Sequence, residues 1–226
     1  MKMLRTFNTH STKIRSNDFV DKFNKKKVLV LGSGPSANER NWQNLDFDCI
    51  ITCNFFYKND DVRKLKNIEH VSLGDLVDLD DERLNSFLDE NKNCTISFEP
   101  KPHPFYVSEP YRRFQKKYKE RVVFYIVEPY TSNFEGIAGR AIYFITGWQP
   151  SEVFYIGIDG ISPSGNDKTN YFDKNLSGDR DGYSISKFKT SHIEMANLLN
   201  KINKEYGIKF YNLGEGLEYN MSSEVT

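Results

Sequence analysis

At 226 residues, the chain is long enough to bury a sizeable core and short enough to form one domain. Its 31 Lys and Arg residues balance its 31 Asp and Glu residues, so the composition shows no signature of nucleic-acid binding. No apolar run approaches the roughly 20 residues of a membrane-spanning helix, and there is no signal-peptide core. The three cysteines show no metal-site spacing, which favours buried thiols in a reducing cytoplasm.

The N-terminal segment is rich in lysine and arginine, against only Asp18 and Asp21. We expect residues 1–26 to be a flexible, solvated leader. The alternative is a peripheral contact with anionic lipid at the inner face of a membrane. Residues 27–217 are expected to form the domain, followed by a tail over residues 218–226.

A strand that runs directly into a glycine turn is the strongest local signal. Val28–Leu31 predicts a strand covered on both faces, and Gly32-Ser33-Gly34-Pro35-Ser36 follows it. The glycines allow a tight turn, and Pro35 suits the first position of a short helix or turn around Ser36–Leu45. Free amides at a helix start bind anions, so the pattern predicts a nucleotide site. A tight turn that binds no ligand is the alternative.

Strands and helices then alternate along the chain. Further strands are expected at Cys49–Cys53, His70–Leu73, Cys94–Phe98, Val122–Val127, Val153–Ile158 and Lys209–Leu213. Helices are expected at Asp60–Lys66, Asp80–Asn91, Pro110–Arg121, Gly139–Gly147 and His192–Tyr206. This order predicts a single α/β domain with a Rossmann-like, doubly wound, mostly parallel sheet. The Gly- and Asn-rich stretch Ser162–Ser186 is expected to form a lid-like loop.

Polar residues and glycines gather where these strands end. Asn54 follows the second strand, while Gly157 and Asp159 follow the strand over Val153–Ile158. Ligands of doubly wound sheets bind at the carboxyl ends of the strands. We therefore expect these residues to line one site.

Together, these motifs resemble the family-42 bacterial sialyltransferases over roughly residues 27–216. The same glycine turn also occurs in pterin-pyrophosphokinase-like proteins, which the chain resembles more distantly. The resemblance is carried by Gly32-Ser33-Gly34-Pro35-Ser36, Cys53-Asn54-x-Phe56, Gly157-Ile158-Asp159, Tyr171-Phe172-Asp173 and Ile208-Lys209-x-Tyr211-x-Leu213.

The resemblance implies an inverting, metal-independent glycosyltransferase without a cofactor. It would move a sialic-acid-like sugar from a CMP donor to a glycan hydroxyl, and its relatives are commonly homo-oligomers. The positions that match nucleotide contacts are Gly32, Ser33, Gly34, Ser36, Asn54, Gly139, Gly157 and Asp159. Tyr171 matches a tyrosine that hydrogen-bonds the departing phosphate.

The chain departs from the family pattern at three places. Ile137-Ala138-Gly139 stands where the family has Thr-Ser-Gly, which removes two hydroxyls. Ile161 replaces a phosphate-contacting tyrosine, a role that Tyr183 is expected to take over. The family's catalytic histidine aligns with Thr190, and a shift of two residues gives that role to His192. We expect His192 to be the base, because a position near a helix N-terminus favours neutral imidazole.

Two other functions fit parts of the pattern. A magnesium-dependent phosphotransferase would use the carboxylates of Asp159, Asp173 and Asp181. A non-catalytic nucleotide-binding module would explain the lost hydroxyls. Asn54 stands where an NAD site needs an acidic residue, which argues against NAD. The basic side chains of the Pro110–Arg121 helix are expected to form a solvated face, with an anionic acceptor or a membrane as the alternative partner.

Overall fold

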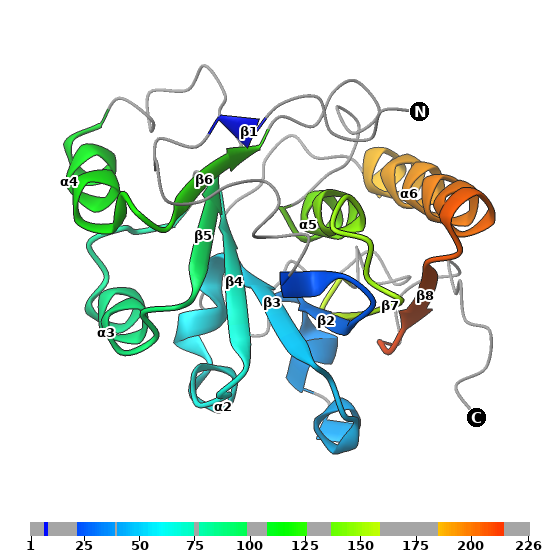
Figure 1. Ribbon diagram of the computed structural model, residues 1–226, viewed down its shortest axis with the longest axis horizontal. Helices are drawn as coiled ribbons and strands as arrows, with labels where there is room; N and C mark the ends of the chain where they lie inside the picture. Colours follow the sequence, from blue (N-terminus) through cyan, green and yellow to red (C-terminus); the bar gives the residue numbers. More distant parts are fainter. Residues whose placement is uncertain are drawn as a thin grey trace.

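The protein is built around one eight-stranded sheet, in the order β1-β6-β5-β4-β3-β2-β7-β8 (Figure 1). The computed structural model describes residues 7–8, 22–38, 40–74, 77–98, 108–125, 137–158 and 185–214. The strands are β1 (Phe7–Asn8), β2 (Lys27–Leu31), β3 (Cys49–Cys53), β4 (Ile68–Leu73), β5 (Thr95–Phe98), β6 (Val122–Tyr125), β7 (Glu152–Ile156) and β8 (Lys209–Asn212).

The sheet is parallel from β2 to β8, and only β1 among the described strands is antiparallel, against β6. The chain builds outward from β2 to β6 and then crosses to β7, on the other side of β2. Strands β2 and β7 are therefore the point where the winding reverses, which is where doubly wound sheets bind their ligands. The expected α/β fold class is confirmed.

Strand β2 lies in the interior of the sheet because its side chains can be buried on both faces. Leu29 and Leu31 pack into one hydrophobic cluster, whereas Val28 and Val30 pack into a second cluster. Such two-sided burial is the environment that continuous apolar runs fit. Strand β3 is likewise buried along its whole length.

Helices cover the two faces of the sheet. The first cluster includes side chains from α2, α3 and α4, and the second includes side chains from α5 and α6. Figure 1 shows α5 and α6 side by side, away from α3. The turn after β2 forms two short 3-10 helices where one short helix or turn was expected. The helices are η1 (Pro35–Asn38), η2 (Arg40–Asn44), η3 (Asn54–Lys58), α2 (Asp60–Arg63), α3 (Glu82–Glu90), α4 (Glu109–Tyr118), α5 (Ile137–Thr146) and α6 (Ile185–Tyr206).

Parts of the expected leader belong to the folded domain. Strand β1 pairs with β6, and Phe23 is fully buried with its ring stacked 4.5 Å from that of Trp148. Lys22 forms an ion pair with Glu69 at 2.6 Å. The sequence pattern suggested a solvated segment because it is dominated by charge, yet a single aromatic residue anchors its end in the core.

Several expectations concern residues outside those described. These are the tail over residues 218–226 and residues 162–184 of the expected lid-like loop; the last two residues of that loop belong to α6. Among the described helices, none has the length and apolar character needed to cross a bilayer.

Candidate nucleotide site at the carboxyl edge of the sheet

The ends of β2 and β7 are joined by direct backbone contacts. The amide of Gly32 donates to the carbonyl of Ile156 at 2.8 Å, and the amide of Gly34 donates to the carbonyl of Gly157 at 2.9 Å. The amide of Gly157 in turn donates to the Ser36 hydroxyl oxygen at 2.9 Å. These three hydrogen bonds fix the glycine turn against the end of β7.

This close approach explains two of the glycines. A Cβ at Gly32 would collide with the Gly157 carbonyl oxygen, and a Cβ at Gly157 would lie 2.6 Å from the Gly32 carbonyl oxygen. Gly157 also has a φ of +73°, in the left-handed region that glycine adopts at little cost. The sequence predicted that the amides of this turn face an anion. Those of Gly32 and Gly34 are instead used to hold β2 to β7.

Ser33, the other polar residue of the glycine turn, takes no part in these contacts. It is only 8% exposed, and among the described residues neither its amide nor its hydroxyl has a hydrogen-bond partner. Its hydroxyl oxygen is not among the fully buried side-chain atoms that lack a partner, so it remains accessible from the surface. Ser33 is therefore the group of this turn best placed to bind a ligand.

Asn54, at the end of β3, is the second predicted residue with free hydrogen-bonding capacity. Its φ is 48°, a left-handed conformation that asparagine tolerates better than most residues. Its side-chain oxygen accepts a hydrogen bond from the Gly74 amide at 2.8 Å. This bond fixes the orientation of the amide group, whose NH2 has no partner among the described residues. An oriented NH2 is a donor for phosphate, ribose or carbonyl oxygens.

The turns after β2 and β3 are linked to each other. The Asn59 side chain, which caps α2, donates to the Asn38 side-chain oxygen of η1 at 3.2 Å. Within the sheet, the Thr52 hydroxyl donates to the Leu31 carbonyl at 3.2 Å. Ser33 and Asn54 thus belong to two turns that are held together across the same edge.

Gly139 has a packing role that its motif did not reveal. It is buried near the start of α5, where a Cβ would lie 3.2 Å from the Met195 sulfur of α6. The small residue allows the two helices to approach. Whether Gly139 also contacts a nucleotide stays a prediction.

The expected catalytic residues, and Asp159 among the expected nucleotide contacts, fall largely outside the described part. Asp159, Tyr171 and Tyr183 lie outside the described residues, and His192 is described only as a backbone position in α6. The expectation that His192 lies near a helix N-terminus is wrong, because α6 begins at Ile185. His192 is two turns inside the helix, so it does not lie beside the free amides of a helix start.

A polar cluster that the sequence did not reveal lies within the sheet. His70, on β4, is fully buried, with its Nδ1 2.7 Å from the Thr95 hydroxyl and its Nε2 2.8 Å from the Ser97 hydroxyl. Ser97 also contacts the Ser72 hydroxyl at 2.9 Å. Burial lowers the pKa of His70 to about 3, with a smaller contribution in the same direction from Lys22. The imidazole is therefore neutral and structural.

The described ionisable groups do not form a metal centre or an activated thiol. Within the described residues, no group of three or more His, Cys, Asp or Glu side chains could hold a metal ion. Burial raises the pKa of Cys53, beside Asn54, to about 12. Cys49 and Cys53 are buried free thiols, as expected, and Cys94 is buried and free as well.

Neither the protein-family models nor the curated proteins include a match to this sequence. Solved structures do share the fold. The chain is similar to the sialyltransferase CstII from Campylobacter jejuni in complex with the substrate analogue CMP-3FNeuAc, at 16% identity and a TM-score of 0.55, covering 85% of this chain and 83% of that chain. It is also similar to the monofunctional alpha-2,3-sialyltransferase Cst-I from Campylobacter jejuni, at 14% identity and a TM-score of 0.56, covering 89% and 78%.

A third similar structure is the sialyltransferase CST-II in complex with a trisaccharide acceptor and CMP. The identity is 17%, the TM-score is 0.52, and the match covers 85% of this chain and 83% of that chain. Likeness at such identities establishes architecture, not chemistry. The resemblance inferred from the motifs is confirmed at that level: this chain has the fold of the Campylobacter sialyltransferases.

Proposed function

We propose that the chain is an inverting glycosyltransferase that moves a sialic-acid-like sugar from a CMP donor to a glycan hydroxyl without a metal. The observation that carries this proposal is a pair of donors, Ser33 and the Asn54 NH2 group, that have no hydrogen-bond partner among the described residues and lie at the carboxyl edge of a sialyltransferase-like sheet. Neutral donors suit the single phosphate and the ribose of a CMP-sugar.

The proposed reaction has one displacement at the anomeric carbon. The acceptor oxygen forms the new bond as the bond to the phosphate oxygen breaks, so CMP departs with the electron pair. His192 takes the acceptor's proton, and Tyr171 and Tyr183 donate hydrogen bonds to the departing phosphate. Ser33 and Asn54 hold the nucleotide so that the anomeric carbon faces the acceptor. We place this reaction in the cytoplasm, on a glycan acceptor.

The first test is calorimetric titration of the full chain with CMP, with and without EDTA, against UDP, ATP and NAD. Saturable CMP binding that survives EDTA supports the proposal and leads to donor-hydrolysis assays on His192→Ala. Binding of ATP that requires magnesium, with no CMP binding, overturns it in favour of phosphotransfer. CMP binding without donor hydrolysis or transfer indicates a binding module.

Asn54→Asp sharpens the test because it separates folding from binding. Aspartate keeps an oxygen for the Gly74 amide and tolerates the left-handed φ, but it replaces the NH2 donor with a negative oxygen. We expect a melting temperature close to that of the wild type and at least a tenfold loss of CMP affinity, on the order of 1.4 kcal/mol. Asn200→Ala, on the exposed face of α6, is the matched control and should change neither quantity.

A further inference from the structure

Tyr57, on η3, has a buried hydroxyl without a hydrogen-bond partner among the described residues. The residue is 0% exposed and lies three positions after Asn54. Buried phenols usually find a partner, because a desolvated polar group that stays unpaired lowers stability. Tyr118, also buried, shows the normal arrangement: its hydroxyl donates to the Asn85 and Asp89 side chains, each at 3.0 Å. The described residues supply no such partner for Tyr57.

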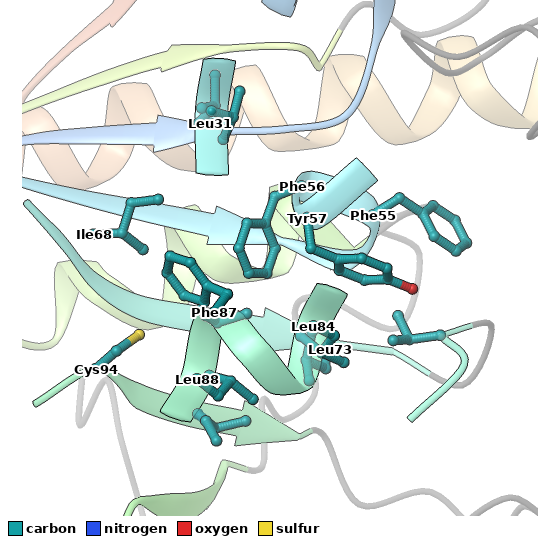
Figure 2. Close-up of a cluster of buried hydrophobic side chains, with 14 of the residues drawn as sticks. Leu31, Phe55, Phe56, Tyr57, Ile68, Leu73, Leu84, Phe87, Leu88 and Cys94 are labelled. Atoms are coloured by element: carbon teal, nitrogen blue, oxygen red, sulfur yellow. The ribbon is translucent and has the colours of Figure 1, made fainter. Parts of the chain in front are cut away.

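The ring of Tyr57 is held in place by its aromatic neighbours. It lies edge-on to Phe56 with ring centroids 5.7 Å apart, and Phe56 lies edge-on to Phe87 of α3 at 4.8 Å. Figure 2 shows the Tyr57 hydroxyl pointing away from this cluster, in the direction of the strand arrows and beyond their carboxyl ends. The hydroxyl therefore points toward the edge that carries Asn54.

The charges around Tyr57 restrict what its partner can be. Burial raises the pKa of the phenol, and the carboxylates of Asp81 and Asp78 raise it further, so the hydroxyl is neutral. The Arg83 guanidinium lowers the pKa of the phenol, but it is one positive charge against two carboxylates, and the remaining negative charge repels a phosphate group from this position. A neutral polar atom of a ligand fits better than an anion.

We infer that Tyr57 is a specificity-determining residue whose hydroxyl hydrogen-bonds a neutral polar atom of the nucleoside part of the donor, beside Asn54. The inference rests on the proposed CMP-sugar function. The position of Tyr57 in the fold supports the inference. In doubly wound sheets the turn after the first strand faces the phosphate, and the end of the next strand faces the ribose. Tyr57 and Asn54 follow β3, which is next to β2.

Calorimetry on Tyr57→Phe, with CMP, cytidine and inorganic phosphate as probes, tests the inference. Losing one neutral hydrogen bond should weaken CMP and cytidine binding by the same factor, about three- to tenfold, while phosphate binding stays unchanged. Without ligand, the melting temperature should be unchanged or higher, because the variant removes an unpaired buried hydroxyl.

Tyr118→Phe is the matched control. It removes a satisfied hydroxyl at the end of α4, just before β6 begins and so at the opposite end of the parallel strands, and it should lower the melting temperature and leave CMP affinity unchanged. If Tyr57→Phe binds CMP and cytidine as the wild type does, or lowers the melting temperature as Tyr118→Phe does, the inference is wrong and the proposed function stands. If the wild-type chain binds neither CMP nor cytidine, the proposed function fails and takes this inference with it.

Discussion

Two turns at the same edge of the sheet use their polar groups in opposite ways. After β2, the amides of Gly32 and Gly34 bond to β7, and the Ser36 hydroxyl accepts from it. After β3, the Asn54 amide is oriented by one hydrogen bond and the Tyr57 hydroxyl has none among the described residues. The first turn therefore uses its two glycine amides and Ser36 to hold the sheet together and leaves only Ser33 for a ligand, whereas the second keeps both Asn54 and Tyr57 available. Glycine-rich turns do not bind phosphate by pattern alone.

The largest expected effect comes from breaking the β2–β7 junction with Gly157→Ala. The added Cβ would press on the Gly32 backbone, at a φ of +73°, where backbone hydrogen bonds hold the two segments together. We expect a loss of more than about 3 kcal/mol in the free energy of unfolding, measured by chemical denaturation.

Gly207→Ala is the control that measures the cost of the positive φ alone, without a steric clash. Gly207 has nearly the same φ, +71°, but nothing lies within 4 Å of its Cβ position. It should cost only about 1 kcal/mol. Equal losses at the two glycines would contradict the view that close contact between β2 and β7 makes Gly157 necessary.

Acid should destabilise the sheet through His70, which is buried on β4. In the unfolded chain the imidazole takes up a proton at the ordinary histidine pKa of 6.5, but in the folded chain its pKa is lowered to about 3. The unfolded state therefore binds protons first as the pH falls. The contribution of His70 to the free energy of unfolding is therefore fully present above about pH 6.5. It declines by up to about 1.4 kcal/mol per pH unit as the pH falls toward 3.

Denaturation of the wild type and His70→Gln across this range checks the contribution. The variant should have the shallower decline between pH 6.5 and about 4, because it removes the titrating imidazole. Parallel curves for the two proteins would mean that His70 does not cause the acid sensitivity.

The smallest effects distinguish the two serines of the first turn. Ser36→Ala leaves the buried Gly157 amide without its acceptor and should cost about 1–3 kcal/mol. Ser33→Ala removes a hydroxyl that has no partner among the described residues, so it should change stability by less than about 0.5 kcal/mol. CMP affinity should fall several-fold only for Ser33→Ala. A loss of CMP affinity in Ser36→Ala but not in Ser33→Ala would contradict the assignment of ligand binding to Ser33.

The sequence predicted the strands well and one helix end poorly. Cys49–Cys53 was predicted with the bounds that β3 has, because continuous burial leaves a continuous apolar run. Strand β1 was missed, since its two residues lie in a charged segment and pair with a strand far along the chain. The start of α6 was placed too late because polar residues such as Ser186 and Thr190 resemble the loop before them.

The candidate site was predictable as a location but not in its details. The edge follows from the order of strands and turns. Which amides remain available depends on β7, whose Gly157 bonds to Ser36 from 121 residues away, and no local pattern contains that contact. Tyr57 was overlooked because it ends an aromatic run, Phe55 to Tyr57, that looks like core, and its unpaired hydroxyl is visible only once the neighbours are placed.

The crossing from β6 to β7 has a consequence for synthesis on the ribosome. Strands β2 to β6 emerge in the order in which they pair, but the other edge of β2 stays open until β7 has left the exit tunnel. Until β7 emerges, the nascent chain exposes an apolar strand with one unpaired edge. Such a surface is bound by chaperones and promotes aggregation. An interior strand of the finished sheet is thus an edge strand for much of translation.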